Sequence, residues 1–101
     1  MSAFEGAESG TMSELDARRR RALWRASHRG TKEMDLMLGA YARAELARMD
    51  AARLARFEAL LALPDPDLNA WILQPALIDG SDFSADIGAL RRFHGLDRRA
   101  D

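Results

Sequence analysis

The sequence predicts an all-α protein, a small five-helix bundle formed by one domain. Apolar residues recur at helical spacing in five segments, and no segment shows the alternation that is typical of a strand. Glycine or proline residues stand between most of these segments, where they end one helix and allow the next to begin. The chain has 101 residues, 48% of them hydrophobic and 31% charged, which suits a single compact domain in water.

The first two helices are expected to form an antiparallel pair around a very short connection. A capping box that starts at Ser13 opens the first helix, residues 13–27. Gly30 ends it, because glycine readily takes the left-handed conformation just past a last helical turn. Thr31 is the expected N-cap of the second helix, which continues to about residue 48. Its core stripe consists of Met34, Met37, Leu38, Tyr41 and Ala42.

Three shorter helices are expected to complete the bundle. Asp50 caps the third helix, and Pro64 ends it. Asp65 is the expected cap of a short fourth helix, with Pro66 at the first helical position. The fifth helix covers residues 84–94 and is followed by a glycine that ends it. The apolar residues that these helices turn toward the core are Leu54, Phe57, Leu60, Leu61, Leu68, Trp71, Ile72, Ile87, Leu90 and Phe93 or His94.

The two ends of the chain are expected to lie outside the folded domain. Residues 1–12 combine Gly, Ser and Ala with two acidic residues and no basic one, which predicts a disordered extension. They resemble neither a secretory signal nor a mitochondrial presequence. Residues 13–96 form the expected helical domain, and residues 97–101 a frayed tail. Because the longest apolar run is far too short to cross a bilayer, we expect no membrane insertion and a bacterial cytoplasmic location.

The composition argues against catalysis and against metal binding. The chain has no cysteine, which excludes disulfides, thiolate metal sites and cysteine nucleophiles. His28 and His94 are its only histidines, too few for a histidine-rich metal site. None of its glycine spacings matches a nucleotide-binding loop. The composition allows a Ser-His-Asp arrangement, but nothing in the sequence indicates an activated serine. We therefore expect no catalytic residue, no cofactor-binding residue and no metal ligand.

A block of positive charge lies within the first helix and the connection after it. The net charge is −1, yet residues 18–32 hold seven cations and no acidic residue. Such a block could meet phosphates or an acidic protein surface, or it could be a solvated helix face. Nucleic acid is disfavoured, because the second helix offers few base-reading side chains and the isoelectric point is about 6.1.

The connection between the first two helices is the most informative site. Each of its residues has a local structural explanation: Arg29 could satisfy helix carbonyls, Gly30 could end a helix, and Glu33 could favour a helix start. Together they also form an exposed knob. Gly30 would let another backbone approach closely, and Arg29 could grip a carboxylate or a carbonyl of a partner.

These residues resemble a known family. Arg29-Gly30-Thr31-Lys32-Glu33 matches the Arg-Gly-x-x-Glu motif of the succinate dehydrogenase flavinylation factors, the SdhE-type assembly proteins. Residues 23–28 before the motif and 34–38 after it agree with the family pattern. So do residues 57–61 and the Asp-x-Asp-Leu-x-x-Trp segment at 65–71, although Asn69 stands where many members carry an aromatic residue. The resemblance is close over residues 15–75.

The resemblance implies a non-enzymatic assembly chaperone. It would bind the flavoprotein subunit of succinate dehydrogenase, fumarate reductase or both, and promote covalent attachment of FAD, a bond that forms autocatalytically in the client. The factor itself would be monomeric when free and would hold no cofactor. The alternative is a carrier that binds FAD and delivers it. The implied client-binding residues are Arg29, Gly30 and Glu33 at the centre, with Trp24, Arg25, His28 and Asp35 around them.

The expected mechanism follows from these residue types. Gly30 would permit close backbone approach, while Arg29 and Glu33 would fix the client's orientation by charged hydrogen bonds. A Gly30→Arg variant should then lose client binding.

Overall fold

The computed structural model describes residues 2–78 and 82–96, with side chains from residue 14 onward except that of residue 78. Its α-helices are α1 (Ser2–Ser27), α2 (Lys32–Glu45), α3 (Ala51–Leu61), α4 (Asp65–Leu73) and α5 (Ser84–Phe93). Two 3₁₀ helices join them, η1 (Leu46–Arg48) after α2 and η2 (Pro75–Ile78) after α4. The described residues contain no strand, so the predicted all-α class with five helices is confirmed. The predicted frayed tail, residues 97–101, lies outside the described residues.

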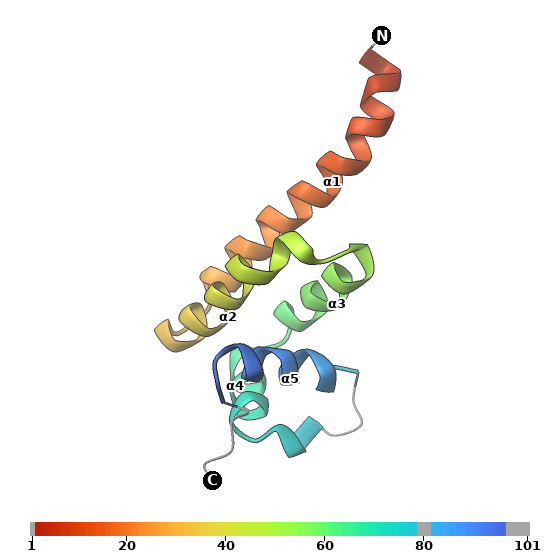
Figure 1. The fold of residues 1–101 in the computed structure, drawn as a ribbon. Helices are drawn as coiled ribbons and strands as arrows, with labels where there is room; N and C mark the ends of the chain where they lie inside the picture. The colour runs from red at the N-terminus through yellow and green to blue at the C-terminus, as the bar shows by residue number, and fades with distance from the viewer. Residues whose placement is uncertain (1, 79–81, 97–101) are drawn as a thin grey trace.

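The helices form a hairpin with a smaller unit packed at one end (Figure 1). α1 and α2 lie side by side and run in opposite directions, and α3 packs against α1. α4 and α5 contact each other, and α5 also reaches α2. The N-terminal part of α1 extends away from the other helices. None of the helices in the described part of the chain is both long and apolar enough to span a membrane.

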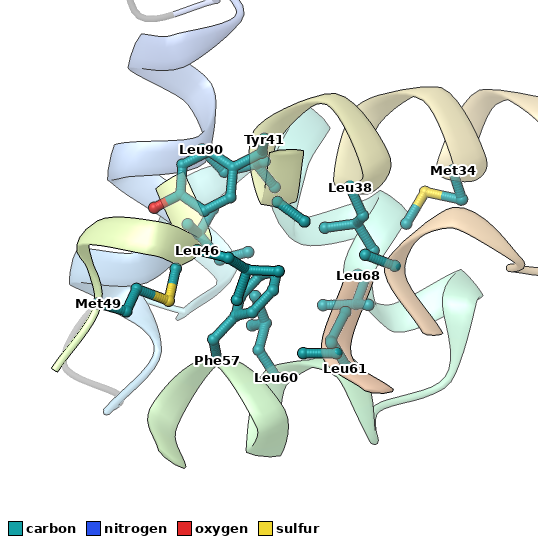
Figure 2. Close-up of a cluster of buried hydrophobic side chains, with 14 of the residues drawn as sticks. Met34, Leu38, Tyr41, Leu46, Met49, Phe57, Leu60, Leu61, Leu68 and Leu90 are labelled. Carbon is teal, nitrogen blue, oxygen red and sulfur yellow. The ribbon is translucent and has the colours of Figure 1, made fainter. Parts of the chain in front are cut away.

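Every helix contributes to a single core (Figure 2). Leu38, Leu54, Leu68 and Leu90, one from each of α2 to α5, are completely buried. α1 contributes only small residues to the fully buried set, Ala22 and Ala26, which lets it approach α2 closely. The expected core stripes are buried, except that Met37 and Trp71 are half-buried and Phe93 is exposed. His94 is half-buried, and its Nε2 lies 2.8 Å from the carbonyl oxygen of Met37.

Three of the predicted helix ends are confirmed. Thr31 caps α2, because its hydroxyl accepts a hydrogen bond from the Met34 amide at 3.2 Å. Asp50 caps α3 by accepting from the Arg53 amide at 2.8 Å. Gly95, just past α5, has φ 73°, the left-handed conformation that glycine adopts without steric cost.

Two other expectations about helix ends are wrong. Gly30 is not left-handed, because Gly95 is the glycine with positive φ among the described residues. Asp65 is not an N-cap, since Pro64 occupies that position in extended conformation and Asp65 is already in the first turn of α4. Its carboxylate is therefore available for a contact elsewhere in the fold.

The first helix also begins earlier than the expected start at Ser13. α1 starts at Ser2, so that residues 2–12 continue the helix where a disordered extension was expected. This stretch has no proline to break a helix. The limits of the expected domain, residues 13–96, stay a prediction.

Candidate interaction surface

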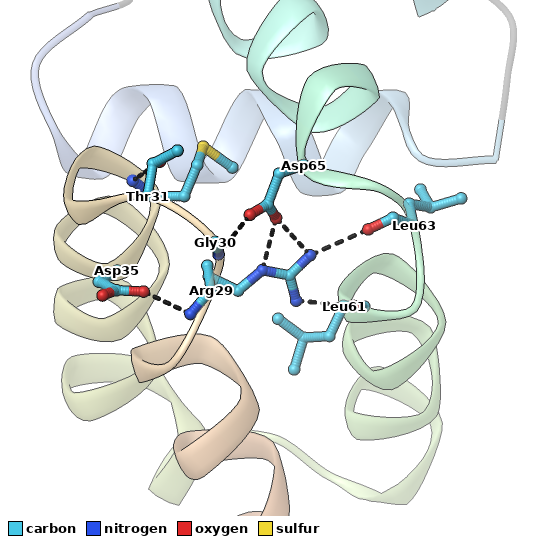
Figure 3. Close-up of polar contacts among 8 residues, drawn as sticks. Arg29, Gly30, Thr31, Asp35, Leu61, Leu63 and Asp65 are labelled. Carbon is cyan, nitrogen blue, oxygen red and sulfur yellow. Dashed lines mark hydrogen bonds and ion pairs between the residues drawn. The ribbon is translucent and has the colours of Figure 1, made fainter.

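Arg29 is turned inward and binds its own chain (Figure 3). Its side chain is only 9% exposed. Nε donates to Oδ1 of Asp65 at 2.8 Å, and one terminal nitrogen lies 2.7 Å from the same oxygen. The terminal nitrogens donate to the carbonyl oxygens of Leu61 at 2.7 Å and Leu63 at 2.9 Å, at the C-terminal end of α3. The expectation that Arg29 is exposed is wrong, because a carboxylate and two helix-end carbonyls within the chain occupy its donors.

Two carboxylates hold the backbone of the connection. The Gly30 amide donates to Oδ2 of Asp65 at 2.7 Å, and the Arg29 amide donates to Oδ1 of Asp35. A Cβ placed on Gly30 would lie 3.1 Å from Oδ2 of Asp65, which is tight because Arg29 holds that carboxylate in place. The turn is thus fixed from both sides, and the backbone of Gly30 faces solvent without a side chain.

The residues of the motif and Asp35 therefore have two different roles: some hold the turn in place, and others are exposed to solvent. Arg29 and the half-buried Asp35 hold the turn, whereas Gly30 and Glu33 are exposed. Glu33 lies in the first turn of α2, and its carboxylate has no hydrogen bond or ion pair within the described residues. The exposed backbone of Gly30 and the Glu33 carboxylate thus lie about one helical turn apart, on a turn that Asp65 and Asp35 hold in place.

An open groove of about 760 Å³ begins beside these two residues and runs between α2 and α4. Gly30, Glu33 and Asp65 lie along it with a largely apolar set from α2, α4 and the end of α5, namely Met34, Met37, Ile72, Leu73 and Leu96. Leu73 is 66% exposed, so part of this apolar surface faces water. The sequence analysis missed the groove. A signal existed in the run Trp71-Ile72-Leu73, because three consecutive residues of a helix cannot all face one core.

Trp24, Arg25 and His28 lie on α1, just before the turn. Trp24 is 62% exposed and stacks on the His28 ring, with ring centroids 4.2 Å apart and an interplanar angle of 13°. Nδ1 of His28 donates to the carbonyl oxygen of Trp24 at 2.8 Å, which keeps its proton on Nδ1. Arg25 is exposed. Trp24 and His28 border a different hollow from that of Gly30 and Glu33, so the seven expected residues do not form one cluster.

Metal-ligating side chains do not gather in the described part of the chain. No group of three or more His, Asp or Glu residues there could hold an ion.

Comparison with known proteins gives consistent matches. The model of a family described as "Flavinator of succinate dehydrogenase" matches residues 20–94. A protein of Acetobacter pasteurianus named FAD assembly factor SdhE is 45% identical over 58 residues, which cover 57% of this chain and 53% of that protein. The mitochondrial succinate dehydrogenase assembly factor 2 of Dictyostelium discoideum is 31% identical over 83 residues, covering 82% of this chain and 58% of that one.

The matched segment accounts for little more than half the length of these two relatives. A third relative, the mitochondrial succinate dehydrogenase assembly factor 2 of Cryptococcus neoformans, is 42% identical over 53 residues, 52% of this chain and 30% of its own length. No solved structure is significantly similar to the chain. The family match includes the turn, Glu33, the Trp24 region and every residue named along the groove except Leu96.

Proposed function

The chain belongs to the family of succinate dehydrogenase flavinators, and on that premise we propose that it is an assembly factor that promotes covalent attachment of FAD. Its client would be the flavoprotein subunit of succinate dehydrogenase, of fumarate reductase, or of both. The names of the Acetobacter and Dictyostelium relatives support this proposal. The factor would act in the bacterial cytoplasm as a monomer before it meets its client.

We propose a helper role without catalysis, in which the covalent bond forms autocatalytically in the client. The exposed groups at Gly30 and Glu33 support this, because Gly30 offers only backbone and Glu33 a carboxylate suited to binding a donor group of the client. A helper of this kind accelerates the reaction by holding the client's flavin and its acceptor side chain in the reactive arrangement. Each ~1.4 kcal/mol by which it favours that arrangement speeds attachment about tenfold.

The observation that carries the proposal is that Gly30 and Glu33 are exposed on a turn that hydrogen bonds hold in place. Asp65 and Asp35 hold the turn before the client arrives, so little conformational entropy is lost when it binds. The client backbone would pass over Gly30, and a cationic or N–H group of the client would meet Glu33. Arg29 acts in this interface as a positioning residue, through Asp65 and the carbonyls at the end of α3.

The groove between α2 and α4 extends the same interface. It is continuous with Gly30 and Glu33, and its methionines can adapt to an incoming side chain. An apolar segment of the client would bury Leu73, which is otherwise left in water.

The test is in-gel flavin fluorescence of the denatured client, produced with the wild-type factor, without it, and with single variants. Glu33→Gln should lower covalent flavin about tenfold or more while the factor's melting temperature stays near that of the wild type. Gly30→Ala should lower covalent flavin as well, and it should also lower the melting temperature, because its Cβ crowds Oδ2 of Asp65. Gly30→Arg should abolish the effect. The matched control is Glu14→Gln, which removes another exposed carboxylate at a distant position on α1 and should leave flavinylation unchanged.

The outcomes separate function from site. If the wild type does not raise covalent flavin, the proposed function is wrong. If the Glu33 and Gly30 variants raise it as fully as the wild type does, the function stands and the interface lies elsewhere.

We also propose that the factor does not carry FAD itself. No glycine-rich loop is available to surround a pyrophosphate. Isothermal titration with free FAD should therefore give no saturable heat, whereas a carrier would saturate.

A further inference from the structure

The arginine-rich block in α1 and the following turn separates into two sets in the structure. Arg18 pairs with Glu58 of α3 through hydrogen bonds of 3.1 and 2.8 Å. Arg19 donates to the Met49 carbonyl at 3.0 Å, and Arg29 is bound to Asp65. These three arginines hold α1 and the turn onto the rest of the fold. The other cations of the block are Arg20, Arg21, Arg25 and Lys32, and none of them has a hydrogen bond or ion pair within the described residues.

Arginines without a partner in the described residues lie beside the exposed, stacked rings of Trp24 and His28. Arg20 and Arg21 precede Trp24 by four and three residues, and His28 follows it by four, so all lie beside it on the surface of α1. Arg43 approaches from α2, where its guanidinium lies over Gly39 and near Ser27. We call this set the Trp24 platform; it comprises Arg20, Arg21, Trp24, His28 and Arg43.

A shallow hollow of about 460 Å³ lies at the centre of the platform. Leu23 and Ser27 of α1 complete its lining between Arg20, Trp24, His28 and Arg43. Most of its surface is apolar. Because Nδ1 of His28 already donates to the Trp24 carbonyl, the ring is locked in its stacked position.

Two carboxylates next to the arginine-rich block already have partners. Glu58 accepts two hydrogen bonds from Arg18, and Asp16 accepts one from Arg19 at 3.2 Å. Arg20 and Arg43 thus carry positive charge that no hydrogen bond or ion pair within the described residues offsets. Arginine and tryptophan are the residue types that dominate binding energy at protein interfaces, and charge of one sign selects a partner of the other sign.

The lining favours a polypeptide over a nucleotide. A pyrophosphate is held by several converging backbone N–H groups, whereas the hollow is lined by side chains along the flank of two helices. An apolar side chain with acidic neighbours fits better, because the apolar group fills the hollow and the carboxylates reach the guanidinium groups at its edge.

We propose that the Trp24 platform binds an acidic segment of the client flavoprotein, with one apolar side chain seated against Trp24 and flanking carboxylates on Arg20 and Arg43. The identity of this partner rests on the proposed function. The platform leads directly into the turn, since His28 is separated from Gly30 by one residue. The client would thus be held at two contiguous places: the Gly30–Glu33 turn, and the platform, which attracts the acidic segment and fixes its direction.

The experiment measures the affinity of the full-length factor for the apo flavoprotein subunit by isothermal titration at about 50 mM and about 500 mM salt. Arg20→Glu and Arg43→Glu should each weaken binding about tenfold at low salt and much less at high salt. Trp24→Ala should weaken it about tenfold at both salt concentrations, because its contribution is apolar. Arg48→Glu is the matched control, an exposed arginine in η1 without a partner in the described structure, and it should change the affinity less than twofold.

Each result has a distinct meaning. If the wild type does not bind the flavoprotein, the proposed function fails, and the partner assignment fails with it. If the wild type binds and the platform variants bind equally well with the same salt dependence, the platform proposal is overturned while the function stands. The proposal is also overturned if the variants keep the client but lose binding of free FAD or of a short DNA duplex, because the platform would then be a phosphate site.

Discussion

Arg29 illustrates how a residue in an interaction motif can act inside its own chain. A guanidinium that is 9% exposed needs partners, because a buried charge without them is strongly unfavourable. The partners of Arg29 are the Asp65 carboxylate and the carbonyl oxygens of Leu61 and Leu63. Carbonyl groups at the end of a helix have no amide partner within that helix. Replacing Arg29 would therefore disturb folding and binding together, which is why Glu33 and Gly30 are the better probes of the interface.

Asp65→Ala should destabilise the protein markedly. The substitution leaves the Arg29 charge largely buried without its carboxylate and removes the acceptor of the Gly30 amide. We expect a loss of about 2–4 kcal/mol in the free energy of unfolding. Asp67→Ala is the control, since Asp67 lies in the same first turn of α4 but is exposed and unpaired in the described structure, and it should cost less than about 1 kcal/mol. Urea denaturation of both variants tests this; equal losses would contradict the role given to Asp65.

Residue roles could be predicted from the sequence where the partner is local. Thr31 and Asp50 cap helices whose amides lie three residues away, so the cap pattern sufficed. The same rule failed for Asp65, because Arg29, 36 residues away, competes for its carboxylate. The prediction of Gly30 as a left-handed helix end failed for a related reason: its amide is bound by Asp65, and the turn needs no positive φ.

At the scale of whole helices, α1 is attached to its neighbours by two different means. Its small buried residues, Ala22 and Ala26, pack closely on α2. Toward α3 it relies on the pair of Arg18 and Glu58. The hydrogen bond from Arg18 lowers the pKa of Glu58 below its ordinary value, opposed by partial burial and assisted by the charges of Arg18, Arg21 and Arg25.

This pair predicts a pH dependence of stability. Because the pKa of Glu58 is lower in the folded than in the unfolded protein, the unfolded state binds more protons as the solution is acidified. The contribution of Glu58 is therefore fully present at neutral pH and is lost as the pH falls from about 5 through its folded pKa. Urea denaturation of wild type and Glu58→Gln at a series of pH values should give a stability difference that shrinks toward pH 3. A difference that stays constant would show that the pair contributes no such dependence.

Helix positions followed from the sequence more readily than the surfaces between helices. Apolar periodicity and helix caps are local signals, and they located α2 to α5 closely. The groove depends on how α4 packs beside α2, which leaves Leu73 in water while Ile72 is buried, and no local pattern reports that packing. The exposure of Trp24 could not be predicted either. An aromatic residue on a helix with a buried alanine face can lie toward the core or toward solvent.

The molecule as a whole is elongated because α1 is longer than the body it packs on. Its principal extents are 60 × 26 × 22 Å, and the N-terminal part of α1 projects beyond the other helices (Figure 1). A helical segment in water gains little stability from its own hydrogen bonds, and most helices in proteins are stabilised by tertiary packing. Leu15 is the first residue of α1 described as packing against the core. The stability of the bundle should therefore depend on α1 from about that residue onward.

Deletion of residues 1–12 tests this division of α1. The projecting segment contains Gly6 and Gly10, which each disfavour a helix by about 1 kcal/mol relative to alanine. We expect the deletion to change the free energy of unfolding by less than about 0.5 kcal/mol, as for surface changes away from packed groups. Leu15→Ala in the full-length chain is the contrasting variant and should lower it by about 1 kcal/mol or more, because it removes partly buried apolar surface. Guanidinium denaturation measures both, and a loss above about 1 kcal/mol for the deletion would mean that residues 1–12 are part of the folding unit. Since Trp24 and Gly30 lie well beyond the deleted segment, the shortened protein should also promote flavinylation as fully as the complete chain.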